Sequence, residues 1–141
     1  MPLAISHRGA NRLAPENTLP AFAKSLEFGV DGFENDVHMT RDGVLVVCHD
    51  DTVDRTSNGT GRICDMTFAE LRALDFGSWF SPEFAGTKIP TLEEFYALCG
   101  NLKIIDVEIK RALDGSTTSA AAVVQLAKKA GLFDRLIVSS F

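Results

Sequence analysis

Gly32-Phe33-Glu34-Asn35-Asp36-Val37 is the stretch of sequence that decides the fold. In a β-strand, successive side chains point to opposite faces, so Glu34 and Asp36 would share one face. Two neighbouring carboxylates on a buried strand repel each other and lose hydration, which predicts a compensating charge. A hard divalent cation is the commonest such partner for carboxylate oxygens. A surface strand with a solvated acidic face is the alternative interpretation, and the rest of the sequence weighs against it.

Composition and charge narrow the class of protein. The chain has 141 residues, of which 45% are hydrophobic and 23% charged, as expected for one globular domain. A net charge of -5 without a Lys/Arg cluster argues against a nucleic-acid partner. The sequence has neither a signal-peptide pattern nor the roughly 18 consecutive apolar residues of a membrane span. Three cysteines without metal-ligand spacing indicate reduced thiols. We therefore expect a cytoplasmic protein that does not bind membranes.

The residues before the acidic stretch predict a βαβ unit. Residues 3–6 form a short apolar run, which we interpret as a buried strand that delivers His7 and Arg8 to its end. Asn17 or Thr18 is suited to cap a following helix, which Gly29 would end. A strand, a helix and a second strand in this order imply a parallel sheet covered by helices.

The next strand has two alternative directions. Asp42-Gly43 is a turn signal, and residues 44–48 form a strand that ends at His49. A hairpin is the simpler arrangement, but it would place His49 and Asp36 at opposite ends of the sheet. If the strands are parallel, residues 37–43 must carry the chain back, and about 23 Å of extended chain suffices. We prefer the parallel arrangement because it brings His49 to Asp36.

Residues 51–90 contain no convincing strand and predict a small inserted element. Thr67 and Glu70 form a capping box for a short helix through Leu74. The aromatic residues that follow are typical of the core of such an excursion rather than of a ligand platform. A second capping box, Thr91 to Glu94, begins a helix that ends at Gly100.

The last third of the chain predicts two more strands. Residues 104–110 alternate, which places Asp106, Glu108 and Lys110 on one face and Ile105, Val107 and Ile109 on the other. An alanine-rich helix begins between residues 116 and 119 and ends at Gly131, and residues 136–139 form the fifth strand.

Polar side chains gather where these strands end: His7, Arg8, Glu34, Asp36, His49, Glu108 and Lys110. In a (β/α) barrel, active groups lie at the C-terminal ends of the strands. Three carboxylates are suited to hold Mg²⁺ or Ca²⁺, and an arginine and a lysine are suited to a phosphate. Two histidines can divide general acid and general base catalysis, so the set predicts metal-assisted cleavage of a phosphodiester. His38 is expected in the connecting turn, with a structural or solvated role.

Ordered motifs along the chain carry a family resemblance: His7-Arg8-Gly9, Pro15-Glu16-Asn17-Thr18, Glu34-x-Asp36, Asp42-Gly43, His49-Asp50, Gly59-Thr60-Gly61, Ile89-Pro90-Thr91-Leu92 and Glu108-x-Lys110. The chain resembles the glycerophosphodiester phosphodiesterases, particularly the short cytosolic bacterial type. This resemblance implies a TIM barrel that hydrolyses glycerophosphodiesters to sn-glycerol 3-phosphate and an alcohol in lipid and glycerol metabolism. It implies that Glu34, Asp36 and Glu108 bind the metal. His7 and His49 are then the acid and base, in an order left open, and Arg8 and Lys110 hold the substrate phosphate.

Two departures accompany the resemblance. Asp106 stands where the family often has asparagine, and only five of the eight barrel strands can be counted, whereas a barrel needs about 250 residues. We therefore expect residues 1–141 to form an incomplete barrel whose open sheet edges promote self-association. A non-catalytic half-barrel that binds metal or phosphate, or acts as an assembly partner, is the alternative function. A phosphate-handling aldolase or isomerase is a third.

Overall fold

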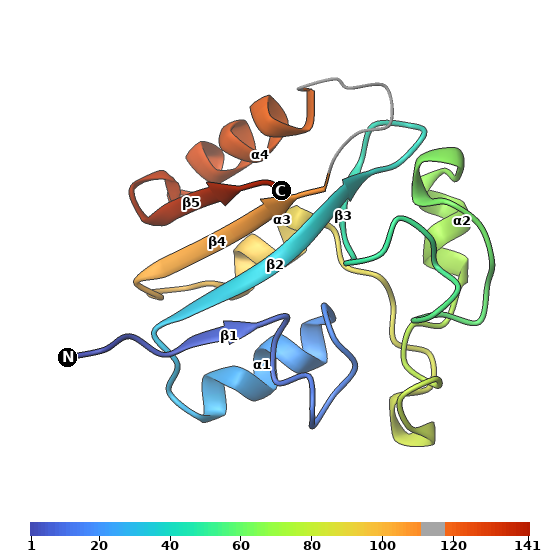
Figure 1. The fold of residues 1–141 in the computed structure, drawn as a ribbon, viewed down its shortest axis with the longest axis horizontal. Coiled ribbons are helices and arrows are strands. Elements are labelled where there is room, and N and C mark those ends of the chain that lie inside the picture. Colours follow the sequence, from blue (N-terminus) through green and yellow to red (C-terminus); the bar gives the residue numbers. More distant parts are fainter. Residues whose placement is uncertain (111–117) are drawn as a thin grey trace.

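The computed structural model describes residues 1–110 and 118–141. Four strands form a parallel sheet in the order β1 (Ile5–His7), β2 (Gly32–Met39), β4 (Ile104–Ile109) and β5 (Leu136–Ser139). A fifth strand, β3 (Leu45–Val47), pairs with the end of β2 (Figure 1). The parallel sheet and the number of strands predicted from the sequence are confirmed.

Three helices cover one face of this sheet: α1 (Leu19–Glu27), α3 (Leu92–Leu98) and α4 (Thr118–Lys129). The core between them is apolar because Phe22, Phe95 and Val123 of the helices meet Phe33 and Val107 of the strands. None of the described helices is long and apolar enough to cross a membrane.

The predicted helix caps are present. The hydroxyl of Thr18 accepts a hydrogen bond from the backbone N–H of Ala21, and Thr91 and Glu94 form a complete capping box. Helix α4 is described from Thr118, so a start at residues 116–117 lies outside the described residues.

The inserted element has a core of its own. Residues 51–90, all of which are described, contain η1 (Ile63–Asp65), α2 (Phe68–Ala73) and η2 (Pro82–Phe84) and no strand. A separate hydrophobic cluster unites Val53, Ile63, Leu71, Phe76 and Ile89 with β3. That residues 51–90 form an inserted element of the domain stays a prediction. A short η3 (Phe133–Arg135) precedes β5.

The predicted direction of β3 is wrong. Val37, His38 and Met39 pair antiparallel with residues 47, 46 and 45, so the turn at Asp42-Gly43 closes a hairpin. His49 nevertheless returns to the level of Asp36, because β2 continues three residues past Asp36 before the hairpin turns. The backbone N–H of Cys48 donates to the carbonyl of Asp36 at 2.9 Å. Strand β4 occupies the other edge of β2, so β1 and β3 lie end to end along the same edge.

Two further expectations need correction. The strand that carries His7 is not buried: Ile5 is 45% exposed, because β1 lies at the edge of the sheet and no other described strand pairs with its far side. His38 does not lie in a turn but near the end of β2, half-buried, on the face of Glu34 and Asp36. The Nε2 atom of His38 lies 3.1 Å from the backbone carbonyl oxygen of His49. This contact agrees with a structural role for His38, one of the two roles expected.

Candidate functional site

Three carboxylates meet on the face of the sheet opposite the helices. Glu34 and Asp36 come from β2, and the register of β2 and β4 places Glu108 directly beside Asp36. One oxygen from each carboxylate lies within 4.8 Å of the others. Among the described residues, these three side chains form the only such group of potential metal ligands. Burial, followed by the charge of Asp36, raises the pKa of Glu34 to about 7. Oxygen donors this close to one another fit a hard divalent cation.

Asp36 is the centre of a polar cluster. It is fully buried, and its Oδ2 accepts a hydrogen bond from Asn17 Nδ2 at 2.9 Å. Arg8 Nε lies 3.3 Å from the same oxygen, and Lys110 Nζ lies 2.9 Å from Oδ1. Lys110 also contacts Glu108, and although burial alone would lower its pKa, these two carboxylates raise it. The structure thus brings the predicted arginine and lysine to the predicted metal ligands.

The first turn of the chain places Arg8. The backbone N–H of Arg8 donates to the carbonyl oxygen of Glu34 at 3.0 Å, at a φ of 59° that non-glycine residues seldom adopt. Gly9 follows with a φ of 80°, and a Cβ there would lie 2.7 Å from the Cβ of Ala21. The loop therefore passes so close to α1 that only glycine fits.

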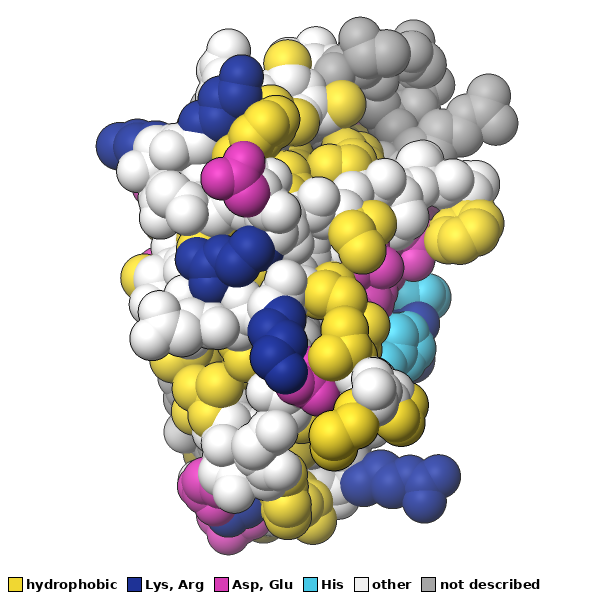
Figure 2. Space-filling view, turned by 90° about the vertical axis from the view of Figure 1, so that its left-hand side faces the viewer, with side chains coloured by type: hydrophobic (Ala, Val, Ile, Leu, Met, Phe, Trp, Pro, Cys, Tyr) yellow, Lys and Arg dark blue, Asp and Glu magenta, His cyan; other side chains and the backbone are white. Residues whose placement is uncertain are grey.

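The two histidines lie at the ends of different strands, and a contact with the three carboxylates is present for His7. His7 pairs with Glu34 in the register of β1 and β2, and its Nε2 lies 3.6 Å from Glu34 Oε2. His49 follows β3, and its Nδ1 lies 2.9 Å from Asp50 Oδ1. In the space-filling view, histidine side chains lie beside acidic ones at the right-hand margin (Figure 2).

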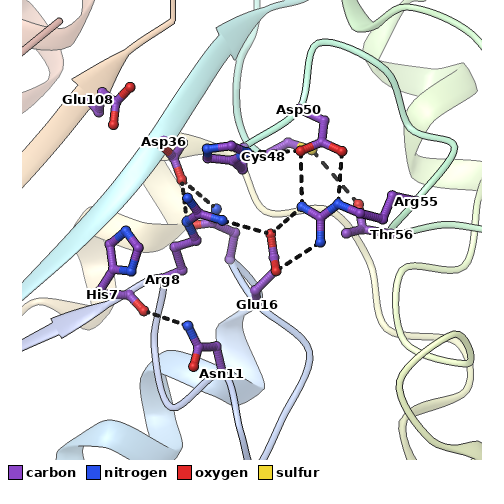
Figure 3. A network of polar contacts seen from close by, with 12 residues as sticks. His7, Arg8, Asn11, Glu16, Asp36, Cys48, Asp50, Arg55, Thr56 and Glu108 are labelled. Atoms are coloured by element: carbon purple, nitrogen blue, oxygen red, sulfur yellow. Dashed lines mark hydrogen bonds and ion pairs between the residues drawn. The ribbon is translucent and has the colours of Figure 1, made fainter. Parts of the chain in front are cut away.

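A second set of side chains at the site was given no role from the sequence, although Glu16 and Asp50 stand in the motifs quoted for the resemblance. Arg55 lies between the carboxylates of Glu16 and Asp50, and Arg8 lies between Glu16 and Asp36 (Figure 3). Hydrogen bonds from Arg55 hold the pKa of Asp50 far below its usual range. Burial alone would raise the pKa of Glu16, but Arg55 and the nearby positive charges lower it.

Asn17 was considered as a helix cap and as part of a quoted motif, but without a role at the site. In the structure Thr18 is the cap, and Asn17 is buried at a φ of 56° with its amide directed at Asp36. Asparagine tolerates this left-handed conformation better than most residues, which is the one local signal for its special position. Arg55 and Glu16 are 39 residues apart, so their contact leaves no local signal in the sequence.

The parallel sheet, its helical layer and the polar cluster at the strand ends define the first part of a (β/α) barrel with its site in the usual place. The chain matches the Glycerophosphoryl diester phosphodiesterase family over residues 7–140. It is 43% identical to the glycerophosphodiester phosphodiesterase of Caldanaerobacter subterraneus subsp. tengcongensis over 140 residues, which are 99% of this chain and 58% of that protein. This chain belongs to the glycerophosphoryl diester phosphodiesterase family.

Solved structures agree with this assignment. A glycerophosphodiester phosphodiesterase from Agrobacterium tumefaciens superimposes with a TM-score of 0.88 at 38% identity, covering all of this chain and 58% of that one. An Oleispira antarctica phosphodiesterase in complex with the product sn-glycerol-3-phosphate superimposes with a TM-score of 0.92 at 36% identity, with the same coverage. The chain therefore spans somewhat more than half the length of these relatives.

Proposed function

We propose that this chain carries the metal-binding and acid–base groups of a metal-dependent glycerophosphodiester phosphodiesterase. Its substrate would be a glycerophosphodiester, and its products sn-glycerol 3-phosphate and an alcohol. The observation that carries the proposal is the cluster of Glu34, Asp36 and Glu108 with Arg8 and Lys110 directly against it. The product bound to the related Oleispira antarctica phosphodiesterase supports the substrate class.

Glu34, Asp36 and Glu108 would hold a divalent cation, Mg²⁺ or Ca²⁺, which supplies positive charge for a phosphate oxygen when bound. Arg8 is suited to bind two phosphate oxygens through its planar fork, and Lys110 one as a point charge.

His7 and His49 would move the protons. One histidine removes the proton of the hydroxyl group that attacks the phosphorus atom of the substrate. The other histidine gives a proton to the alkoxide that leaves as the P–O bond breaks. The contact of His49 Nδ1 with Asp50 leaves the other ring nitrogen, Nε2, available for that transfer.

A binding role without catalysis is the second candidate. The chain spans 58% of the related proteins, and strands at both edges of its sheet expose apolar side chains such as Ile5 and Ile137. A half-barrel with these edges would bind the metal or phosphate and associate with a second copy or another partner.

We also propose a cytoplasmic location, which is supported by three free thiols at Cys48, Cys64 and Cys99.

Turnover and metal binding separate the two functions. Glycerophosphocholine is incubated with the chain and Mg²⁺ or Ca²⁺, and released sn-glycerol 3-phosphate is measured. His7→Ala and His49→Ala should each lower kcat by about 100-fold to 10,000-fold while leaving metal affinity intact.

Metal binding is measured separately by titration calorimetry. Asp36→Asn and Glu108→Gln should abolish it, whereas Asp31→Asn, a carboxylate at the other end of the central strand, should not. Metal binding without turnover would favour the binding role. Unchanged affinity in Asp36→Asn would contradict the proposed metal site and, with it, the metal-dependent phosphodiesterase.

A further inference from the structure

Arg55 makes an unusual double contact between two loops. Its guanidinium group donates from Nε and Nη2 to the two oxygens of Asp50, at 2.9 and 3.0 Å. It also donates from Nη1 and Nη2 to the two oxygens of Glu16, at 3.1 and 2.7 Å. One planar group thus engages two carboxylates in bidentate fashion, one from the loop after β1 and one from the loop after β3 (Figure 3).

Each of these carboxylates also contacts a residue to which we assign a functional role. Asp50 Oδ1 lies 2.9 Å from Nδ1 of His49, and Glu16 Oε1 lies 3.5 Å from Nη1 of Arg8. Arg8 in turn reaches Asp36 at 3.3 Å. Charges of alternating sign therefore run without interruption from Asp50, which contacts the imidazole of His49, to Asp36, a candidate metal ligand.

The hydrogen-bond inventory of imidazole determines what Asp50 does to His49. An ionised carboxylate only accepts, so Nδ1 of His49 must carry the hydrogen. In a neutral ring Nε2 is then unprotonated and can accept a proton. Asp50 can impose this tautomer only while its own oxygens are fixed, and Arg55 fixes both of them.

We propose that Arg55 is a positioning residue, which orients the proton-transfer imidazole of His49 and the phosphate-binding Arg8 by clamping Asp50 and Glu16. The consequence for turnover rests on the proposed function, whereas the orientation of His49 does not. Lysine would keep the charge but lose the fork, because its ammonium group is a point donor that cannot hold two carboxylates in one plane.

Arg55→Lys tests the clamp, and Arg72→Lys is the matched control. Arg72 forms a similar bidentate pair with Glu94, at 2.9 and 2.6 Å, in the contact between α2 and α3. The tautomer of His49 is read by NMR from the chemical shifts of its two ring nitrogens, in a chain whose histidines carry a nitrogen isotope label. The measurement is made at a pH where the ring is neutral. Thermal unfolding of each variant is measured alongside.

We expect the Nδ1–H tautomer of His49 in the parent chain and in Arg72→Lys, and a mixture of tautomers in Arg55→Lys. Asp50→Asn should shift the tautomer in the same way, which covers the case in which Arg55→Lys fails to fold. In turnover, Arg55→Lys should lower kcat by about 10-fold to 100-fold, the range found for groups that support a functional residue. Combined with Asp50→Asn, it should add little.

The outcomes are distinguishable. If Arg55→Lys lowers thermal stability as Arg72→Lys does and leaves the His49 signals unchanged, Arg55 is structural and the proposal is wrong. An Nε2–H tautomer in the parent chain would also overturn it. If the tautomer shifts as expected but the parent chain shows no turnover, the clamp stands and the proposed function fails.

Discussion

The balance of charges around Asp36 explains why the pKa of the neighbouring Glu34 is raised. Among the described residues, the three carboxylates Glu34, Asp36 and Glu108 have two lysine or arginine side chains in contact with them, Arg8 and Lys110. Both positive groups contact Asp36, and Lys110 also contacts Glu108. Glu34 is left with the weakest compensation, and its pKa rises to about 7 through burial and the charge of Asp36.

This raised pKa links both stability and metal binding to pH. Because the folded pKa of Glu34 (about 7) exceeds its ordinary value of 4.5, the folded metal-free chain binds a proton that the unfolded chain has already lost. The contribution to stability is complete below the ordinary pKa and disappears as pH rises through the folded one. A cation must displace the same proton, so metal affinity should increase between about pH 5 and pH 8.

Urea unfolding and calorimetry across this range check both trends. Glu34→Gln cannot lose a proton, so it should flatten the dependence of metal-free stability on pH, whereas Glu27→Gln, an exposed residue of α1, should not. A parent chain whose metal-free stability rises over this window would contradict the assignment.

The face on which each candidate ligand lies was predictable from the alternation of side chains along its own strand. Glu34 and Asp36 share one face of β2, and Glu108 lies on the same face of β4. Arg8, Lys110, His7 and His49 were predictable as strand-end residues. The supporting side chains were not predictable in this way. Arg55, Asp50 and Glu16 act through contacts between loops, and no local pattern encodes a contact that depends on how two loops fold over each other.

At the level of elements, the hairpin of β2 and β3 shows why the strand direction was misjudged. The turn signal at Asp42-Gly43 was correct, but the length of β2 was not known from the sequence. An ending near Val37 would have carried His49 away in a hairpin. Because β2 extends to Met39, the hairpin returns His49 to Asp36 instead.

Gly43 tests the hairpin directly. It has a φ of 83°, and no atom would lie within 4 Å of an added Cβ, so a substitution here changes only backbone strain. Gly43→Ala should lower the free energy of unfolding by about 1 kcal/mol in urea unfolding experiments. Gly43→Asn should cost less, because asparagine tolerates positive φ. Equal losses in both variants would argue against a purely conformational effect.

At the level of the whole molecule, β1 and β5 lie at the two sides of the parallel sheet, and neither pairs with another described strand on its outer side. Ile5 of β1 and Ile137 of β5 are 45% and 46% exposed. On the side where the parallel strands begin, hydrophobic side chains are scattered among lysines and arginines (Figure 2). The sequence predicted the partial barrel from the number of strands, but not the exposure of β1, because an apolar run has the same pattern on a covered strand and on an edge strand.

We expect the 141-residue chain to associate through these edges. Light scattering at increasing concentration should show species larger than the monomer. Lysines on the edge strands, introduced as Ile5→Lys and Ile137→Lys, should shift the chain towards the monomer. Phe28→Lys is the control, because Phe28 is 65% exposed but follows α1 rather than lying on a strand. A monomer at all concentrations, or equal effects of all three variants, would refute association through the edges.

Strands β1 and β3 lie along one edge of β2 and approach from opposite directions, so the row of strand pairing is interrupted opposite Asn35 and Asp36. The chain leaves the sheet at this gap twice, after β1 and after β3. Insertions in the loop after either strand would therefore reshape the rim of the candidate site and change which molecules it admits. The carboxylates would keep their places through such remodelling, because they belong to strands that neither loop interrupts.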